Sequence, residues 1–140
     1  MNISAEVQRD IDLKVDNLLQ EMYRTEEKLA IDSRMAWHWM PESFKVFLVL
    51  DSDTAARRIF THLQKGGRTG EDATSVDEVR NSIDRRFASE QKRYAGLYRV
   101  NPTDPSNFDI VINTKYNNLE TVSGMLLAAY RAWRMDGNDL

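Results

Sequence analysis

Residues 44–50 read Phe-Lys-Val-Phe-Leu-Val-Leu, an apolar run interrupted only by Lys45. A short and almost continuous apolar run is typical of a strand that is covered on both faces, as in a parallel sheet. Two further short runs, 29–32 and 108–113, also have the character of strands. Because helical patterns separate these segments, the sequence predicts an α/β fold: a parallel sheet of about three strands, flanked by helices in three layers.

Four segments carry the signals of helices. Apolar residues recur in them three or four positions apart, and Ser4, Asp53 and Ser75 are placed to cap the first three. We expect helices over 4–25, 53–65, 75 to beyond 97, and about 118–135. Glycine and proline make 66–74 and 101–107 connections between them.

The composition is that of one soluble globular domain. The 140 residues are 41% hydrophobic and 29% charged, and they include no cysteine. The lack of cysteine excludes disulfides, thiolate metal sites and cysteine nucleophiles, and it favours a cytoplasmic location. No apolar run has the length of a membrane span or the character of a signal peptide. We therefore expect one cytoplasmic domain over 1–140, with a frayed tail at 136–140 and no membrane partner.

Charge is distributed unevenly along the chain, which has a net charge of −3. Residues 1–32 hold four basic and eight acidic residues, whereas residues 65–99 hold eight basic and six acidic ones. Proteins that bind nucleic acid present a strongly basic face, and this chain has only a modest local excess. We therefore expect a small phosphorylated ligand rather than a nucleic acid.

The first candidate site follows the 29–32 run, where Asp32, Ser33 and Arg34 stand together. Ligands of open parallel sheets bind beyond the carboxyl ends of the strands. A carboxylate there can hold a hydrated Mg²⁺ ion, and a guanidinium can bind phosphate oxygens through two parallel hydrogen bonds. The alternative is structural: Asp32 caps the following turn and Arg34 neutralises its charge.

The second candidate site is a set of charged residues on the long helix. Arg86, Glu90 and Arg93 are spaced i, i+4, i+7, so they share one face. Two arginines at this spacing can bracket a phosphate chain, with Glu90 orienting one of them. The alternative is a solvated face with surface ion pairs, each of which contributes little stability.

The third candidate site is the connection over 66–74, which places Arg68 among three glycines. A glycine-rich segment with one arginine suits a mobile lid that closes over a ligand and excludes water. The alternative is an ordinary connection between two helices.

A phosphate-binding loop of the form G-x-x-x-x-G-K-[ST] does not occur in these 140 residues. Backbone N–H groups and the lysine of that motif hold the phosphates of a nucleotide. The six glycines are at positions 66, 67, 70, 96, 124 and 137, and none is followed by lysine.

The order of these segments resembles the cytidylate kinase family, and especially its short archaeal members. Most specific is Ser89-Glu90-Gln91-Lys92-Arg93-Tyr94, followed by the aspartate-containing run 108–113. The resemblance covers about residues 5–133 and also includes Leu29–Ala36, Phe44–Leu50, Ala55–Ile59, Ile83–Arg86 and Leu97–Tyr98.

The resemblance implies a P-loop nucleoside monophosphate kinase fold, which transfers a phosphoryl group from ATP to CMP or dCMP with Mg²⁺. Asp32 matches the family's strand-end acidic residue near the metal, and Arg34 matches its acceptor-nucleotide arginine. Arg86 and Arg93 match the lid-side arginines that meet phosphates. Arg58 matches a further family arginine whose role here stays open.

Two departures from the family pattern bear on activity. The family's N-terminal part, with the P-loop strand and helix, has no counterpart in these residues, and Phe87 occupies a position that is usually acidic and linked to cytosine recognition. We therefore expect the carboxyl-terminal portion of a cytidylate-kinase-like protein, inactive alone. The alternative is a non-catalytic protein that kept the scaffold and self-associates or binds nucleotide or phosphate. A sheet without its central strand exposes apolar edges, so we expect a homo-oligomer in either case.

Overall fold

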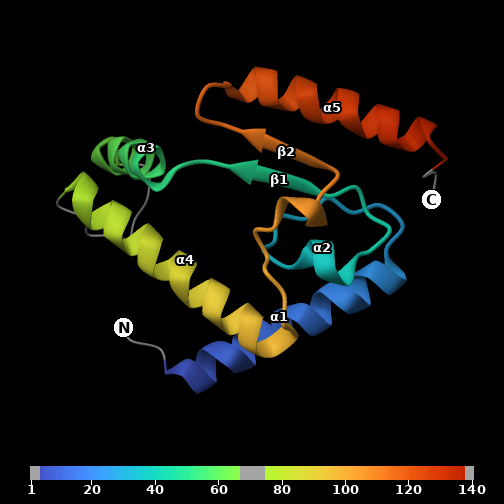
Figure 1. The fold of residues 1–140 in the computed structure, drawn as a ribbon, viewed down its shortest axis with the longest axis horizontal. Coiled ribbons are helices and arrows are strands. Elements are labelled where there is room, and N and C mark those ends of the chain that lie inside the picture. The colour runs from blue at the N-terminus through green and yellow to red at the C-terminus, as the bar shows by residue number, and fades with distance from the viewer. Residues whose placement is uncertain (1–3, 67–74, 138–140) are drawn as a thin grey trace.

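The structure is a computed structural model that describes residues 4–66 and 75–137 (Figure 1). Five α-helices, one short 3₁₀ helix and two strands make up this part of the chain. In chain order they are α1 (Ala5–Thr25), α2 (Ala36–Trp39), β1 (Val46–Val49), α3 (Ser52–Gln64), α4 (Val76–Tyr98), the 3₁₀ helix η1 (Pro105–Asn107), β2 (Ile110–Asn113) and α5 (Leu119–Met135).

The two strands form a parallel sheet, as the apolar runs predict. Val46 pairs with Ile110 and Val49 with Asn113, so the strands are in register along their whole length. The backbone N–H of Lys45 also donates to Oδ2 of Asp109 at 2.6 Å, which fixes the start of both strands. The structure therefore confirms an α/β chain with a parallel sheet.

The third expected strand, 29–32, does not form. Leu29 to Asp32 lie in no strand, and Leu29 is exposed. A strand is held by hydrogen bonds to a neighbour, and in the part of the chain that the structure describes, β1 and β2 pair only with each other. The sheet thus has two strands where we expected about three.

Ser4 and Ser75 cap their helices as predicted, Asn118 caps the last helix without having been predicted to, and the predicted cap of α3 is corrected. Ser4, Ser75 and Asn118 accept hydrogen bonds from backbone N–H groups of the first turns of α1, α4 and α5. The expected cap of α3 was Asp53, but Asp51 accepts from the backbone N–H of Thr54 at 2.9 Å. Asp53 lies inside the first turn, where it pairs with Arg57 one turn later.

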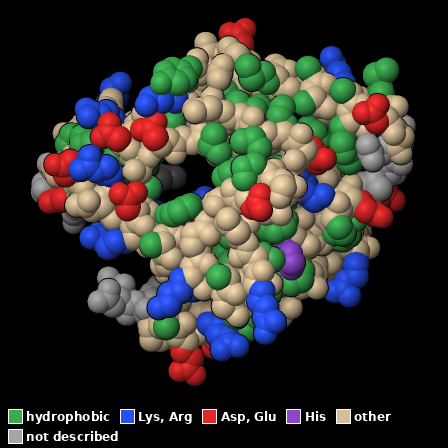
Figure 2. Space-filling model, in the orientation of Figure 1, with side chains coloured by type: hydrophobic (Ala, Val, Ile, Leu, Met, Phe, Trp, Pro, Cys, Tyr) green, Lys and Arg blue, Asp and Glu red, His purple; other side chains and the backbone are tan. Residues whose placement is uncertain are grey.

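The elements are arranged around a long diagonal helix. Figure 1 shows α4 running from α3 down to α1, which crosses it, while α5 lies beside β2. Phe44, just before β1, contacts both Tyr130 and Trp133 of α5, with ring centroids 5.6 Å apart in each case. In the space-filling view of Figure 2 the molecule is hollowed near its centre, with hydrophobic side chains on the rim.

The apolar stripe of α1 is not buried. Val7, Ile11, Val15 and Leu18 are each at least two-fifths exposed, whereas Leu19 is buried together with two carboxylates of the adjacent face. The helix is therefore held to the rest of the molecule by a partly polar face. No helix among the described residues combines the length and apolar content that a bilayer crossing needs.

Candidate functional site

A cavity of about 380 Å³ lies where α1, the segment after it and α4 meet. We call it the α1–α4 cavity. Its polar lining comes from three places in the sequence: Asp12 and Asp16 of α1, residues 32–34, and Glu90 and Arg93 of α4. The structure thus brings together two of the candidate sites that the sequence predicts separately.

Arg34 is held in this cavity by Glu90. The guanidinium Nε of Arg34 lies 3.2 Å from Oε2 of Glu90, and the Glu90 side chain is mostly buried. The sequence predicted that Glu90 would orient an arginine of its own helix. In the structure its partner is instead Arg34, from the segment that precedes α2.

Arg93 is held by α1 and by its own helix. Its Nε donates to Oδ2 of Asp12 at 2.6 Å, and its Nη1 donates to the Ser89 hydroxyl oxygen at 2.7 Å. The side chain of Asp12 is 8% exposed and that of Arg93 is 21% exposed. Water screens this ion pair little, so it strongly restricts where the guanidinium can point.

A second polar contact joins α1 to α4 beside the first. The Tyr98 hydroxyl donates a hydrogen bond to Oδ2 of Asp16, whose side chain is also buried. Burial, followed by this hydrogen bond, raises the pKa of Tyr98 above its ordinary range, and burial also raises the pKa of Tyr94. Both phenols are therefore neutral and able to donate at physiological pH.

Asp32 is the one cavity carboxylate whose side chain has no partner among the described residues. It makes no hydrogen bond or ion pair with any residue that the structure describes, whereas Asp12 and Asp16 are already engaged. No cluster of three or more His, Cys, Asp or Glu side chains suited to a metal occurs among the described residues. Mg²⁺, however, is usually held by one or two carboxylates, water and substrate phosphates, so Asp32 fits that ion when a phosphate is present.

The other predicted residues lie outside the cavity. Arg58 of α3 donates from Nη2 to the backbone carbonyls of Thr114 and Lys115, at 3.0 and 3.3 Å, and so anchors the chain after β2. Arg86 is exposed on α4 and has no ion pair with any residue in the described ranges. Phe87 is half-exposed and does not line the cavity. Arg68 lies outside the described residues.

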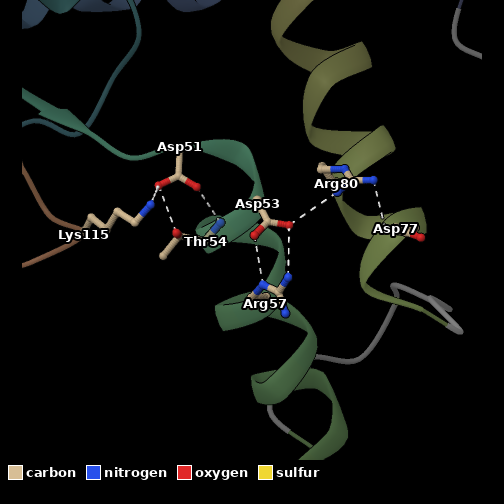
Figure 3. Close-up of polar contacts among 7 residues, drawn as sticks. All are labelled: Asp51, Asp53, Thr54, Arg57, Asp77, Arg80 and Lys115. Carbon is tan, nitrogen blue, oxygen red and sulfur yellow. Dashed lines mark hydrogen bonds and ion pairs between the residues drawn. The ribbon is translucent and has the colours of Figure 1, made fainter.

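The carboxyl ends of β1 and β2 carry a separate polar cluster (Figure 3). Asp51, after β1, lies 3.1 Å from Nζ of Lys115, after β2, and also accepts hydrogen bonds from Thr54. Asp53 stands between Arg57 and Arg80, which ties α3 to α4. The charges in this cluster compensate one another, so it serves to join the elements.

Asp51 should make the free energy of unfolding depend on pH in the acidic range. Hydrogen bonds from the backbone and hydroxyl of Thr54 and from Lys115 lower its pKa from 3.8 to about 2. Since the folded pKa is below the unfolded one, this contribution is complete above pH 3.8 and is lost as the pH falls towards 2. In urea unfolding we expect the wild type to exceed Asp51→Asn in stability at pH 5, with the difference closing near pH 2. A difference that does not change with pH would contradict this account.

The two buried carboxylates of α1 were not among the predicted site residues. Asp12 and Asp16 are four residues apart, and so are Tyr94 and Tyr98, with Arg93 immediately before Tyr94 in the motif of α4. Each pair lies on one face of its helix. This spacing is a signal for two facing polar stripes, although it does not by itself say that the two helices meet.

Comparison with known proteins gives a consistent match. Residues 2–116 match the model of the cytidylate kinase-like family. The chain is 28% identical over 131 residues to the cytidylate kinase of Thermoplasma volcanium, covering 90% of this chain and 64% of the relative. It is 29% identical over 110 residues to the cytidylate kinase of Methanothermobacter thermautotrophicus, covering 79% and 63%.

A relative with another name also matches. An S-adenosylmethionine-dependent nucleotide dehydratase of Lacinutrix mariniflava is 27% identical over 124 residues, covering 84% of this chain and 24% of the relative. No solved structure matches the chain. The chain spans slightly less than two thirds of the length of the two cytidylate kinases above. Because the family match covers most of its residues, the chain belongs to the cytidylate kinase-like family.

Proposed function

We propose that this chain binds CMP or dCMP in the α1–α4 cavity and forms the acceptor-nucleotide part of an ATP-dependent cytidylate kinase. The observation that carries the proposal is that Asp32 and Arg34, from one segment, meet Arg93 of α4 in one cavity. The names of the relatives supply the base of the nucleotide. Phe87 does not line the cavity.

The two arginines suit the phosphate of such a nucleotide. Each guanidinium carries five N–H donors, and each is held through its Nε by a carboxylate, Glu90 for Arg34 and Asp12 for Arg93. The Nη2 group of Arg93 and both Nη groups of Arg34 make no hydrogen bond with any described residue. They are left to bind phosphate oxygens, which accept charge-assisted hydrogen bonds from guanidinium groups.

Phosphoryl transfer depends on stabilising the negative charge of the transferred phosphoryl group and on positioning it against the acceptor phosphate. In the proposed enzyme Asp32 holds the Mg²⁺ ion, which neutralises phosphate charge when it is bound. Arg34 and Arg93 keep the acceptor phosphate in place. A glycine-rich loop with a lysine normally holds the phosphates of ATP, and these 140 residues contain no glycine followed by lysine. We therefore propose that the isolated chain binds the acceptor but does not transfer phosphate.

The same reasoning extends to the fold. We propose that β1 and β2 belong to the three-layer parallel sheet of a P-loop kinase-like fold. Two observations support this: Leu48 of β1 and Val111 of β2 are exposed on the sheet, and the apolar stripe of α1 is exposed as well. Apolar groups of this kind are normally covered in a layered α/β protein.

Calorimetric titration with CMP tests the binding. Because each of Arg34 and Arg93 contributes charge-assisted hydrogen bonds to the phosphate, Arg34→Gln and Arg93→Gln should each weaken CMP binding about tenfold. Arg131→Gln, which removes an exposed arginine of α5, should leave the affinity unchanged. Cytidine, which lacks the phosphate, should bind wild type and both cavity variants equally.

Two results would count against the proposal. Equal CMP affinity in wild type and both cavity variants would show that the phosphate binds elsewhere. Conversion of CMP to CDP by the pure 140-residue chain with ATP and Mg²⁺ would contradict the expected lack of turnover.

A further inference from the structure

A second and larger cavity, of about 670 Å³, opens between the first turns of α1 and the second half of α4. We propose that this groove, which we call the basic groove, binds an oligophosphate, meaning a ligand with two or more linked phosphate groups. Arg9, Lys92 and Arg93 supply its charge, and Ser89, Gln8 and Gly96 line the space between them. The proposal goes beyond acceptor-nucleotide binding and does not depend on it.

The charge of the groove is the first argument. Among the described residues that line it, three side chains are cationic and none is a carboxylate. Arg9 and Lys92 are exposed and make no hydrogen bond or ion pair with any residue that the structure describes. Of the three cationic side chains, only Arg93 forms an ion pair with a described residue, Asp12. In a chain with a net charge of −3 this local excess of positive charge would attract an anion. Figure 2 likewise shows Lys and Arg side chains gathered on the lower part of the molecule, where α4 and α1 cross.

The shape of the groove is the second argument. Ser89, Lys92, Arg93 and Gly96 recur at i, i+3, i+4 and i+7, so they form one stripe along α4. At 1.5 Å per residue this stripe is about 10 Å long, which suits a chain of linked phosphates better than a single one. A Cβ built on Gly96 would meet nothing within 4 Å, so the space above the stripe is open.

The basic groove is distinct from the α1–α4 cavity, although the two adjoin. Both are lined by Gln8 and Arg93, but Asp32 and Arg34 line only the cavity, whereas Arg9 and Lys92 line only the groove. Variants can therefore separate the two. Arg34 variants test the cavity alone, and Arg9 or Lys92 variants test the groove alone.

Gly96 provides the sharpest test. In calorimetric titrations of the full chain with sodium tripolyphosphate, Gly96→Glu places a carboxylate in the groove and should weaken binding at least about tenfold, because charge repulsion replaces attraction. Gly96→Ala is the matched control, since it adds a methyl group to open space without charge, and it should retain the wild-type affinity.

A charge-matched pair gives an independent test. Arg9→Gln/Lys92→Gln should weaken tripolyphosphate binding about tenfold, since each partly exposed contact is expected to contribute about threefold. Lys14→Gln/Arg131→Gln removes the same charge from exposed positions outside the groove and should have no effect. Binding by the wild type should also weaken as salt rises from 0.05 to about 0.3 M, because exposed charges are screened.

The outcomes separate cleanly. The proposal is overturned if tripolyphosphate binds no better than sulfate, if Gly96→Glu and Gly96→Ala bind alike, or if only Arg34→Gln weakens binding. Circular dichroism melting of each variant confirms that it is folded. Unchanged CMP affinity in Arg9→Gln/Lys92→Gln would support two separate sites. The CMP-binding proposal is tested separately, by the CMP affinity of Arg34→Gln.

Discussion

Replacing Asp12 with alanine is expected to lower the free energy of unfolding by about 2 kcal/mol. The substitution leaves the Arg93 guanidinium, 21% exposed, without its carboxylate partner 2.6 Å away. Breaking a fully buried pair typically costs about 3–5 kcal/mol, because the remaining charge is poorly solvated. Water reaches part of Arg93, and alanine is the better helix former, so the expected loss is smaller.

Urea unfolding monitored by circular dichroism measures this loss. Asp77→Ala is the control, since it removes an exposed carboxylate that also pairs with an arginine, Arg80, and should cost less than about 1 kcal/mol. The double variant Asp12→Leu/Arg93→Met replaces both charges with apolar groups and should recover much of the loss. Equal stability losses in Asp12→Ala and Asp77→Ala would show that the α1–α4 ion pair contributes no more than a surface pair.

Met35→Ala is expected to have the largest effect on stability, about 3 kcal/mol, because it removes a fully buried side chain and leaves a void. Met35 is 1% exposed and lies between the α1–α4 cavity, which it lines, and the start of α2. Its carbonyl accepts from the backbone N–H of His38, so the residue also begins the short helix. Truncation would enlarge the α1–α4 cavity beside Arg34 and loosen the segment before α2 that contains Arg34.

Met135→Ala is the matched control for this substitution. Met135, in the last turn of α5, is 87% exposed, so the same chemical change should alter stability by less than about 0.5 kcal/mol. Thermal unfolding of both variants measures the difference. If Met35→Ala unfolds at the wild-type temperature, the segment around Met35 is not part of the folded core.

Asp12 and Met35 together explain how a chain with a small core holds its candidate site. Among the described residues the buried core side chains are few and are spread along the chain: Leu19, Met35, Met40, Ala56, Val79, Tyr94, Ile112 and Val122. Polar contacts between α1 and α4 therefore supply stability that a larger apolar core would otherwise provide. The same contacts position Arg93, so stability and phosphate binding should be linked at this residue.

Local structure was determined by the sequence itself. Ser4, Ser75 and Asn118 cap helices because a side-chain oxygen accepts a backbone N–H only three residues away. Residues 44–50 and 108–113 contain the two strands because short, mostly apolar runs suit a parallel pair. The cover expected on both faces is incomplete in the structure, where Leu48 and Val111 are exposed. The motif on α4 also identified the family. Each of these signals lies within a few turns of chain, where neighbouring residues decide the outcome.

Only the tertiary structure decided which faces meet. It turned Asp12 and Asp16 of α1 inward while the apolar stripe stayed exposed, joined Glu90 to Arg34, and placed Arg58 against the chain after β2. It also left 29–32 without a strand partner. Periodicity shows that a helix or strand has two different faces, but not what each face contacts. That depends on groups distant in sequence, whose hydrogen bonds and charges compete with apolar burial.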